Sequence, residues 1–156
     1  MKLPLAVGSV VVLILMGSGV MLAQSDPFIG TWKLNLAQSK FTAGIPPKEQ
    51  TVTLVQAGDQ YQVTISGKAP DGTPFSGKYS IPMKGGAGKV LAGPYDAVSS
   101  KRINDNTLDV SDMKGGKEVM HIHVEVSKDG KTQTGTAKGV DLQGKPVASV
   151  GVYDKE

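Results

Sequence analysis

The chain has 156 residues, with 17 Lys and Arg against 14 Asp and Glu, two His and no Cys. The net charge of +3 is small and the lysines are spread singly, whereas a nucleic-acid-binding surface needs clustered basic residues, so we expect no nucleic-acid partner. Without cysteine there is no disulfide framework and no lipidated N-terminal cysteine.

The N-terminal segment has the composition of an export signal. Met1 and Lys2 precede an uncharged, mostly apolar run from Leu3 to Ala23, and the polar stretch Gln24-Ser25-Asp26 follows. One basic residue, an apolar run and small residues before a polar stretch are typical of a signal peptide. We therefore expect residues 1–23 to direct export to the periplasm or the extracellular space. The alternative is an uncleaved inner-membrane anchor over residues 3–23, because about 20 apolar residues span a bilayer.

The rest of the chain, residues 24–156, is predicted to be a single domain. Its 133 residues are enough for one hydrophobic core, and loss of Lys2 would leave sixteen basic against fourteen acidic residues, a net charge of +2. We expect this domain to be a monomer that meets a membrane only through the N-terminal segment.

The domain is dominated by two-residue alternation of apolar and polar side chains, which indicates half-buried strands. Turn pairs such as Asp71-Gly72 and Asp129-Gly130 separate the strands and favour hairpins. No useful stretch has helical spacing of apolar residues. The predicted strands are Thr31–Leu36, Thr51–Leu54, Tyr61–Ile65, Phe75–Ile81, Val98–Ile103, Thr107–Ser111, Glu118–Ser127, Lys131–Val140 and Pro146–Tyr153.

A sequential meander of this kind exposes two long edges unless the sheet closes on itself. We therefore predict an all-β fold, an antiparallel up-and-down β-barrel of about 8–10 strands, with a β-sandwich as the alternative. Residues 37–49 contain Pro46-Pro47 and are predicted to form an extended connection. The glycine-rich residues 84–94 are predicted to form a flexible loop at the barrel rim. Their "KGGAGKV" is not a phosphate-binding loop, because that pattern would need glycine at Met83 and a hydroxyl at Val90.

Two motifs at the ends of the domain resemble one family of barrels. "GTWKLN" at residues 30–35 resembles the Gly-x-Trp signature of the calycins, which include lipocalins and fatty-acid-binding proteins. "SVGVYDK" at residues 149–155 resembles the closing strand of the intracellular fatty-acid-binding proteins, which commonly ends in Val-Tyr-Glu-Lys. A similar opening block, extended here by Ser39-Lys40-Phe41, is found in short exported bacterial proteins of uncharacterised function.

The resemblance implies a closed barrel whose first and last strands pair. It implies that Trp32, the only tryptophan, plugs one end, that Gly30 allows close approach of the chain, and that Lys155 or Arg102 covers the indole ring. The fatty-acid-binding proteins hold a carboxylate with an arginine two residues before the closing tyrosine, but here Gly151 stands two residues before Tyr153. The helical lid of that family and the Thr-Asp motif of lipocalins are also missing. A fatty acid is therefore not implied as the ligand.

We predict that the protein binds a small hydrophobic or amphipathic ligand inside the barrel, without a cofactor and without enzymatic activity. No G-x-S-x-G motif or cysteine nucleophile is present. The alternative is a structural, interaction or inhibitor-like barrel with a filled core, acting through rim loops 37–49 and 84–96; a cavity of about 300 Å³ or more would favour the ligand. The predicted ligand-binding residues are Trp32, Leu34, Tyr61, Phe75, Tyr79, Arg102, Met120, Ile122 and Tyr153, with Leu36, Val52, Leu54 and Val63 as further lining.

The pair His121 and His123 is the weaker candidate for a second function. Alternation places both histidines and Glu125 on one face of a strand, opposite the apolar Ile122 and Val124. A His-x-His pair can present two imidazoles to a metal ion. Because the apolar face is the natural core face, we expect a solvated pair, with metal capture as the alternative.

Overall fold

The computed structural model describes residues 25–156 as an all-β fold of twelve antiparallel strands, with no helix in this part of the chain. The predicted N-terminal signal or anchor, residues 1–23, lies outside the described residues. Within them, no helix is long and apolar enough to cross a membrane. The strands are β1 (Gly30–Leu34), β2 (Lys40–Ala43), β3 (Glu49–Ala57), β4 (Gln60–Lys68), β5 (Pro74–Pro82), β6 (Gly85–Ala87), β7 (Lys89–Ala92), β8 (Ala97–Asn104), β9 (Thr107–Lys114), β10 (Lys117–Val126), β11 (Thr132–Val140) and β12 (Pro146–Lys155).

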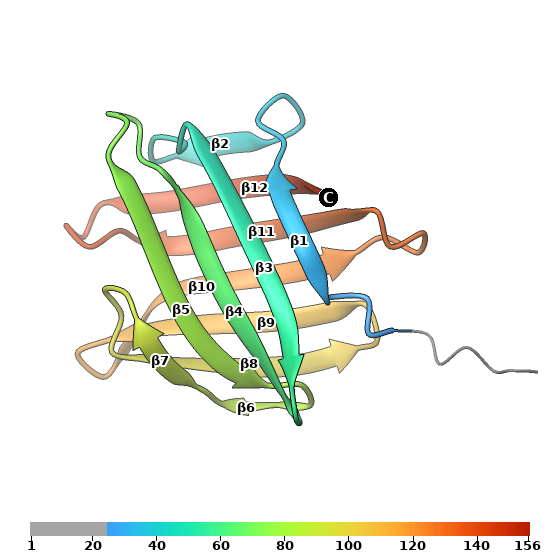
Figure 1. The fold of residues 1–156 in the computed structure, drawn as a ribbon. Coiled ribbons are helices and arrows are strands. Elements are labelled where there is room, and N and C mark those ends of the chain that lie inside the picture. Colours follow the sequence, from blue (N-terminus) through green and yellow to red (C-terminus); the bar gives the residue numbers. More distant parts are fainter. Residues whose placement is uncertain (1–24) are drawn as a thin grey trace, which may run out of the picture.

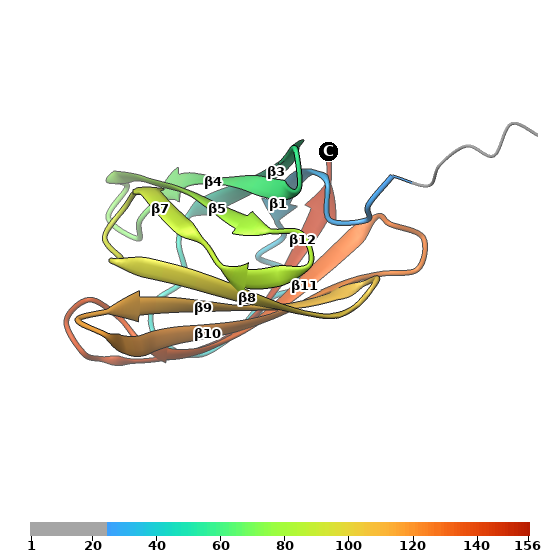
Figure 2. The same cartoon turned by 90° about the horizontal axis from the view of Figure 1, so that it is seen from below.

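The strands form one sheet that folds into two crossing layers. The order is β6-β8-β9-β10-β11-β12-β1-β3-β4-β5-β7, with β2 added beside β12. Figure 1 shows β1, β3, β4 and β5 running steeply across β8 to β12, and Figure 2 shows the two layers edge-on. The predicted all-β antiparallel barrel is confirmed, and it is nearly closed.

One seam of the barrel joins the first strand to the last. Trp32 in β1 lies opposite Lys155 in β12 on one side and opposite Val52 in β3 on the other. The two motifs at the ends of the domain thus meet in adjacent strands, as the calycin resemblance implies. Glycine suits this seam because Gly30 has a φ of 144°, a backbone conformation that residues with side chains rarely adopt.

The other seam is formed by the segment that we expected to be a flexible rim loop. Residues 84–94 instead contain β6, which pairs with β8, and β7, which pairs with β5. These two short strands connect the two ends of the sheet through Gly88, whose amide donates a 2.8 Å hydrogen bond to the Val98 carbonyl. The loop prediction was wrong because glycine-rich sequence lacks side-chain alternation, although its backbone can still pair.

The prediction of an extended connection for residues 37–49 was incomplete. Lys40 to Ala43 form β2 and pair with β12. The Pro46-Pro47 pair follows this strand, where an amide donor is not required. Leu36, expected to face the interior, lies beyond the end of β1 and is exposed.

Gly88 tests the importance of the seam. A Cβ at this position would lie 2.3 Å from the Ser80 carbonyl oxygen and 2.7 Å from Cγ2 of Ile81, so part of the seam must move to accept it. We expect Gly88→Ala to lower the free energy of unfolding by about 2 kcal/mol, as overpacking does elsewhere.

Gly77→Ala in β5 is the matched control, because its Cβ would meet only the Ala92 carbonyl oxygen, at 3.7 Å. That variant should stay within about 0.5 kcal/mol of the parent protein in urea denaturation. Equal stability of the two variants would contradict the role given to Gly88.

Candidate functional site

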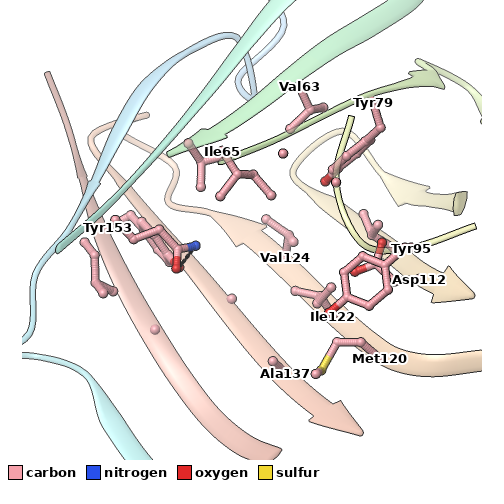
Figure 3. A pocket seen from close by; sticks show the side chains of 18 of the residues that line it. Val63, Ile65, Tyr79, Tyr95, Asp112, Met120, Ile122, Val124, Ala137 and Tyr153 are labelled. Atoms are coloured by element: carbon pink, nitrogen blue, oxygen red, sulfur yellow. Dashed lines mark hydrogen bonds between the residues drawn. The ribbon is translucent and has the colours of Figure 1, made fainter. Parts of the chain in front are cut away.

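A cavity of about 510 Å³ lies between the two layers. Its walls are mainly aliphatic and aromatic side chains, contributed by β3, β4 and β5 from one layer and by β9 to β12 from the other. Figure 3 shows Val63 and Ile65 on one side and Ile122 and Val124 on the other. Strand alternation explains this lining, because every second residue of a strand points to the same face.

Six of the nine predicted ligand-binding residues line this cavity, and so do three of the four further lining residues. The six are Leu34, Phe75, Tyr79, Met120, Ile122 and Tyr153, and the three are Val52, Leu54 and Val63. Trp32, Tyr61 and Arg102 are not part of the lining. They belong to the packed end of the barrel, so their contribution is to close it.

Trp32 is fully buried at this packed end. Its indole Nε1 donates a 3.0 Å hydrogen bond to the Phe28 carbonyl, and Nζ of Lys155 lies 5.0 Å from the centre of the ring. A buried indole needs such a polar partner, and a cation over its face adds electrostatic attraction. Of the two candidate cations, Lys155 is therefore the one that covers Trp32.

Arg102 closes the same end by a different set of contacts. Its Nη1 donates to the Tyr61 hydroxyl at 2.5 Å and forms an ion pair with Asp26 at 3.1 Å. Its guanidinium carbon lies 4.8 Å from the centre of the Phe28 ring. Further donors reach the carbonyls of Asn104 and Asp105, both at 2.7 Å. The charge of Arg102 is thus paired within the packed end of the barrel, and the guanidinium does not line the cavity.

The cavity contains one acidic side chain, Asp112 in β9, which the sequence prediction missed. It follows Leu108 and Val110 on the inner face and is 8% exposed. Burial alone raises the pKa of its carboxyl from 3.8 to about 6. Alternation from Leu108 and Val110 would have placed Asp112 on the inner face. The predicted strand ended at Ser111, one residue before Asp112, whereas β9 continues to Lys114.

Three tyrosines, Tyr79, Tyr95 and Tyr153, are among the other polar side chains of the lining. Burial raises the pKa of Tyr79 and Tyr95, and the negative charge of Asp112 adds to both shifts. Burial also raises the pKa of Tyr153 to about 12, and its hydroxyl accepts a 3.1 Å hydrogen bond from Gln50. All three phenols therefore stay protonated at neutral pH and can donate hydrogen bonds.

Gln133 adds one more polar side chain to the wall, across from Tyr153 in the sheet. It is buried, and its Oε1 has no hydrogen-bond partner among the described residues. A side-chain amide can turn either a donor or an acceptor toward a guest, so Gln133 adapts to the polarity it meets.

The histidine pair lies on the outer face of β10, as alternation predicts. The side chains of His121 and His123 are 44% and 41% exposed, and Nδ1 of His123 contacts Oδ1 of Asp109 at 2.5 Å. Among residues 25–156, no three or more His, Asp or Glu side chains are arranged to hold a metal ion. Metal capture by this pair therefore gains no support from its geometry.

Comparison with known proteins gives similarity in fold alone. No family model matches the chain, and no curated protein matches it. A zebrafish ileal bile acid-binding protein, solved with cholic acid, is similar with a TM-score of 0.49 and 17% identity, over 83% of this chain and 99% of that one. A redesigned β-barrel is similar with a TM-score of 0.46 and 15% identity, over 83% of this chain and 92% of that one.

Asp112 should make stability depend on pH. The folded protein holds the Asp112 proton more tightly than the unfolded chain, because the pKa is raised from 3.8 to about 6. This contribution is therefore present at low pH and is lost as the pH rises through 6. Relative to Asp112→Asn, we expect the parent protein to lose about 3 kcal/mol of stability between about pH 4 and pH 7.

Urea denaturation of both proteins across this pH range checks the expectation. The comparison isolates one carboxyl, because the variant keeps every other titratable group. A stability difference between the two proteins that does not change with pH would show that burial of Asp112 carries no such penalty.

Proposed function

We propose that the barrel binds one small hydrophobic or amphipathic molecule in the cavity between its layers. The observation that carries the proposal is the cavity of about 510 Å³ with its mainly apolar wall. Small-molecule sites in proteins typically enclose about 300–1,000 Å³ and combine an apolar lining with a few polar groups. Asp112, Tyr79, Tyr95 and the Gln50–Tyr153 pair are those polar groups here.

This cavity favours ligand binding over the alternative of a filled barrel that acts through its rim. A small barrel packed by its own side chains leaves little free interior. Here small residues stand on the cavity wall where larger side chains would reduce the free space, including Gly135 and Ala137 on β11. At Gly151 a Cβ would lie 3.0 Å from Cε2 of Tyr153, so this glycine makes room for the Tyr153 ring on the wall.

Reducing the free volume of the cavity should weaken binding. Ala137 lies on the wall, and Figure 3 places it beside Met120. We expect Ala137→Phe to weaken binding of Nile red, a neutral apolar dye, at least about tenfold, because the added ring occupies the apolar space that the dye needs. Dye fluorescence titration measures the change.

Lys138→Phe is the matched control, because it adds the same ring to the exposed neighbour on the outer face of β11. It should leave dye affinity unchanged. Absence of dye binding to the parent protein, or equal affinities for the parent and Ala137→Phe, would contradict binding in this cavity.

We also propose that the protein is exported, with residues 1–23 as its signal. The uncharged, mostly apolar run from Leu3 to Ala23, which follows Lys2 and precedes a polar stretch, supports this. On expression with the full N-terminus, we expect the intact mass of the recovered protein to lack roughly the first 20 residues. A full-length mass in the membrane fraction would instead support the anchor.

A further inference from the structure

Asp112 is an acid that the protein buries without giving it a partner. It is 8% exposed and lines the cavity from the inner face of β9. No hydrogen bond or ion pair joins its carboxyl to another of the residues 25–156. An unpaired buried carboxylate is costly, so a site that retains one has an unmet demand for a donor or a positive charge.

The surroundings of Asp112 contain no positive charge that meets this demand. Its neighbours in the sheet, Val98 on β8 and Met120 on β10, are apolar. From the elements packed across the cavity, the titratable groups that sense its charge are Tyr79 on β5 and Tyr95, and Asp141 lies close enough to raise the pKa of Tyr95 as well. All of these groups are neutral or negative, and the cavity wall has no Lys, Arg or His among the described residues.

Arg102, unlike Asp112, has its charge paired within the protein. Arg102 is also largely buried, but its ion pair with Asp26 and its hydrogen bonds neutralise it within the packed end. Those contacts leave no positive charge free for Asp112. The cavity therefore has a negative electrostatic end, near Asp112, and an apolar remainder. Figure 3 shows this end, with the Asp112 side chain beside the Tyr95 ring and with Tyr79 projecting into the cavity.

We propose that the cavity is selective for amphiphiles whose polar group is a cationic amine, with the ammonium bound at Asp112 and the hydroxyls of Tyr79 and Tyr95, and the apolar part against the remaining wall. An ammonium supplies the donors and the charge that the carboxyl lacks. An anionic head group would instead meet the carboxylate at low dielectric with no cation to offset the repulsion. The inference rests on the proposed function and adds the chemical class of the ligand.

Three single-chain amphiphiles of equal length separate the head groups: dodecylamine, dodecanol and dodecanoate. Each is used to displace Nile red from the parent protein near pH 7.5, below its micelle concentration. We expect dodecylamine to bind at least about tenfold more tightly than dodecanoate, with dodecanol between them, as a charged hydrogen bond adds affinity over a neutral one. In Asp112→Asn, dodecylamine affinity should fall about tenfold while dodecanol affinity stays constant.

Asp109→Asn is the matched control, because it makes the same substitution on the outer face of the same strand. It should leave the order and size of all three affinities unchanged. Lowering the pH to about 5 should remove the preference for dodecylamine over dodecanol in the parent protein, since the Asp112 carboxyl then takes up a proton and dodecanol does not titrate. The variant Asp112→Leu, which removes the polar group altogether, replaces Asp112→Asn if the latter does not fold.

The outcomes distinguish the two proposals. If dodecanol and Nile red bind but dodecanoate binds as tightly as dodecylamine, the preference for amines is wrong and the ligand-binding function stands. The preference for amines at Asp112 is also wrong if Asp112→Asn retains the full preference for dodecylamine, because Asp112 is then not the group that binds the ammonium. If neither the dye nor any amphiphile binds, the proposed function itself is wrong.

Discussion

Closure of the sheet between β5 and β8 holds the two layers apart, and the interior depends on it. The closing segment contributes β6 to one edge and β7 to the other, and Gly88 stands at the crossing with no room for a side chain. Without this seam, the edges of β5 and β8 would expose unpaired backbone groups and the layers could collapse on each other. The short β6–β7 segment therefore fixes the space between the layers as well as the sheet edges.

Polar and charged groups are paired at the packed end of the barrel, whereas Asp112 in the cavity is not. At the packed end, Trp32 and Arg102 have their polar groups satisfied by nearby carbonyls, hydroxyls and the Asp26 carboxylate. These contacts satisfy the polar groups of Trp32 and Arg102 within the protein. Inside the cavity, Asp112 has no such partner, so its desolvation is not offset. The polar groups of the packed end are therefore paired, whereas Asp112 in the cavity is unpaired. Only Asp112 is left to discriminate between ligands by their charge.

Local pattern was enough to predict the long strands, the closed antiparallel barrel and the burial of Trp32, since alternation and turn residues report directly on strands. Pairing between segments that are far apart in the chain cannot be predicted from the local sequence pattern. Residues 84–94 have few side chains to alternate, so they were predicted to form a loop. β2 was missed because its four residues, Lys40–Ala43, are too few for alternation to stand out. Asp112 was missed because a charged residue conventionally ends a core-facing pattern, whereas here the strand continues through it to Lys114.

The features that lower stability are also those that a ligand would use. A large apolar cavity forfeits packing contacts, and an ionised Asp112 forfeits hydration. Both losses are reversed when a guest of suitable shape and charge enters, and a ligand that binds only the folded state adds its binding free energy to stability. A core built only for stability would place larger apolar side chains at 112, 135 and 137 and fill the space. The residues present instead leave room for a guest in the middle of the barrel and give it a polar contact at Asp112.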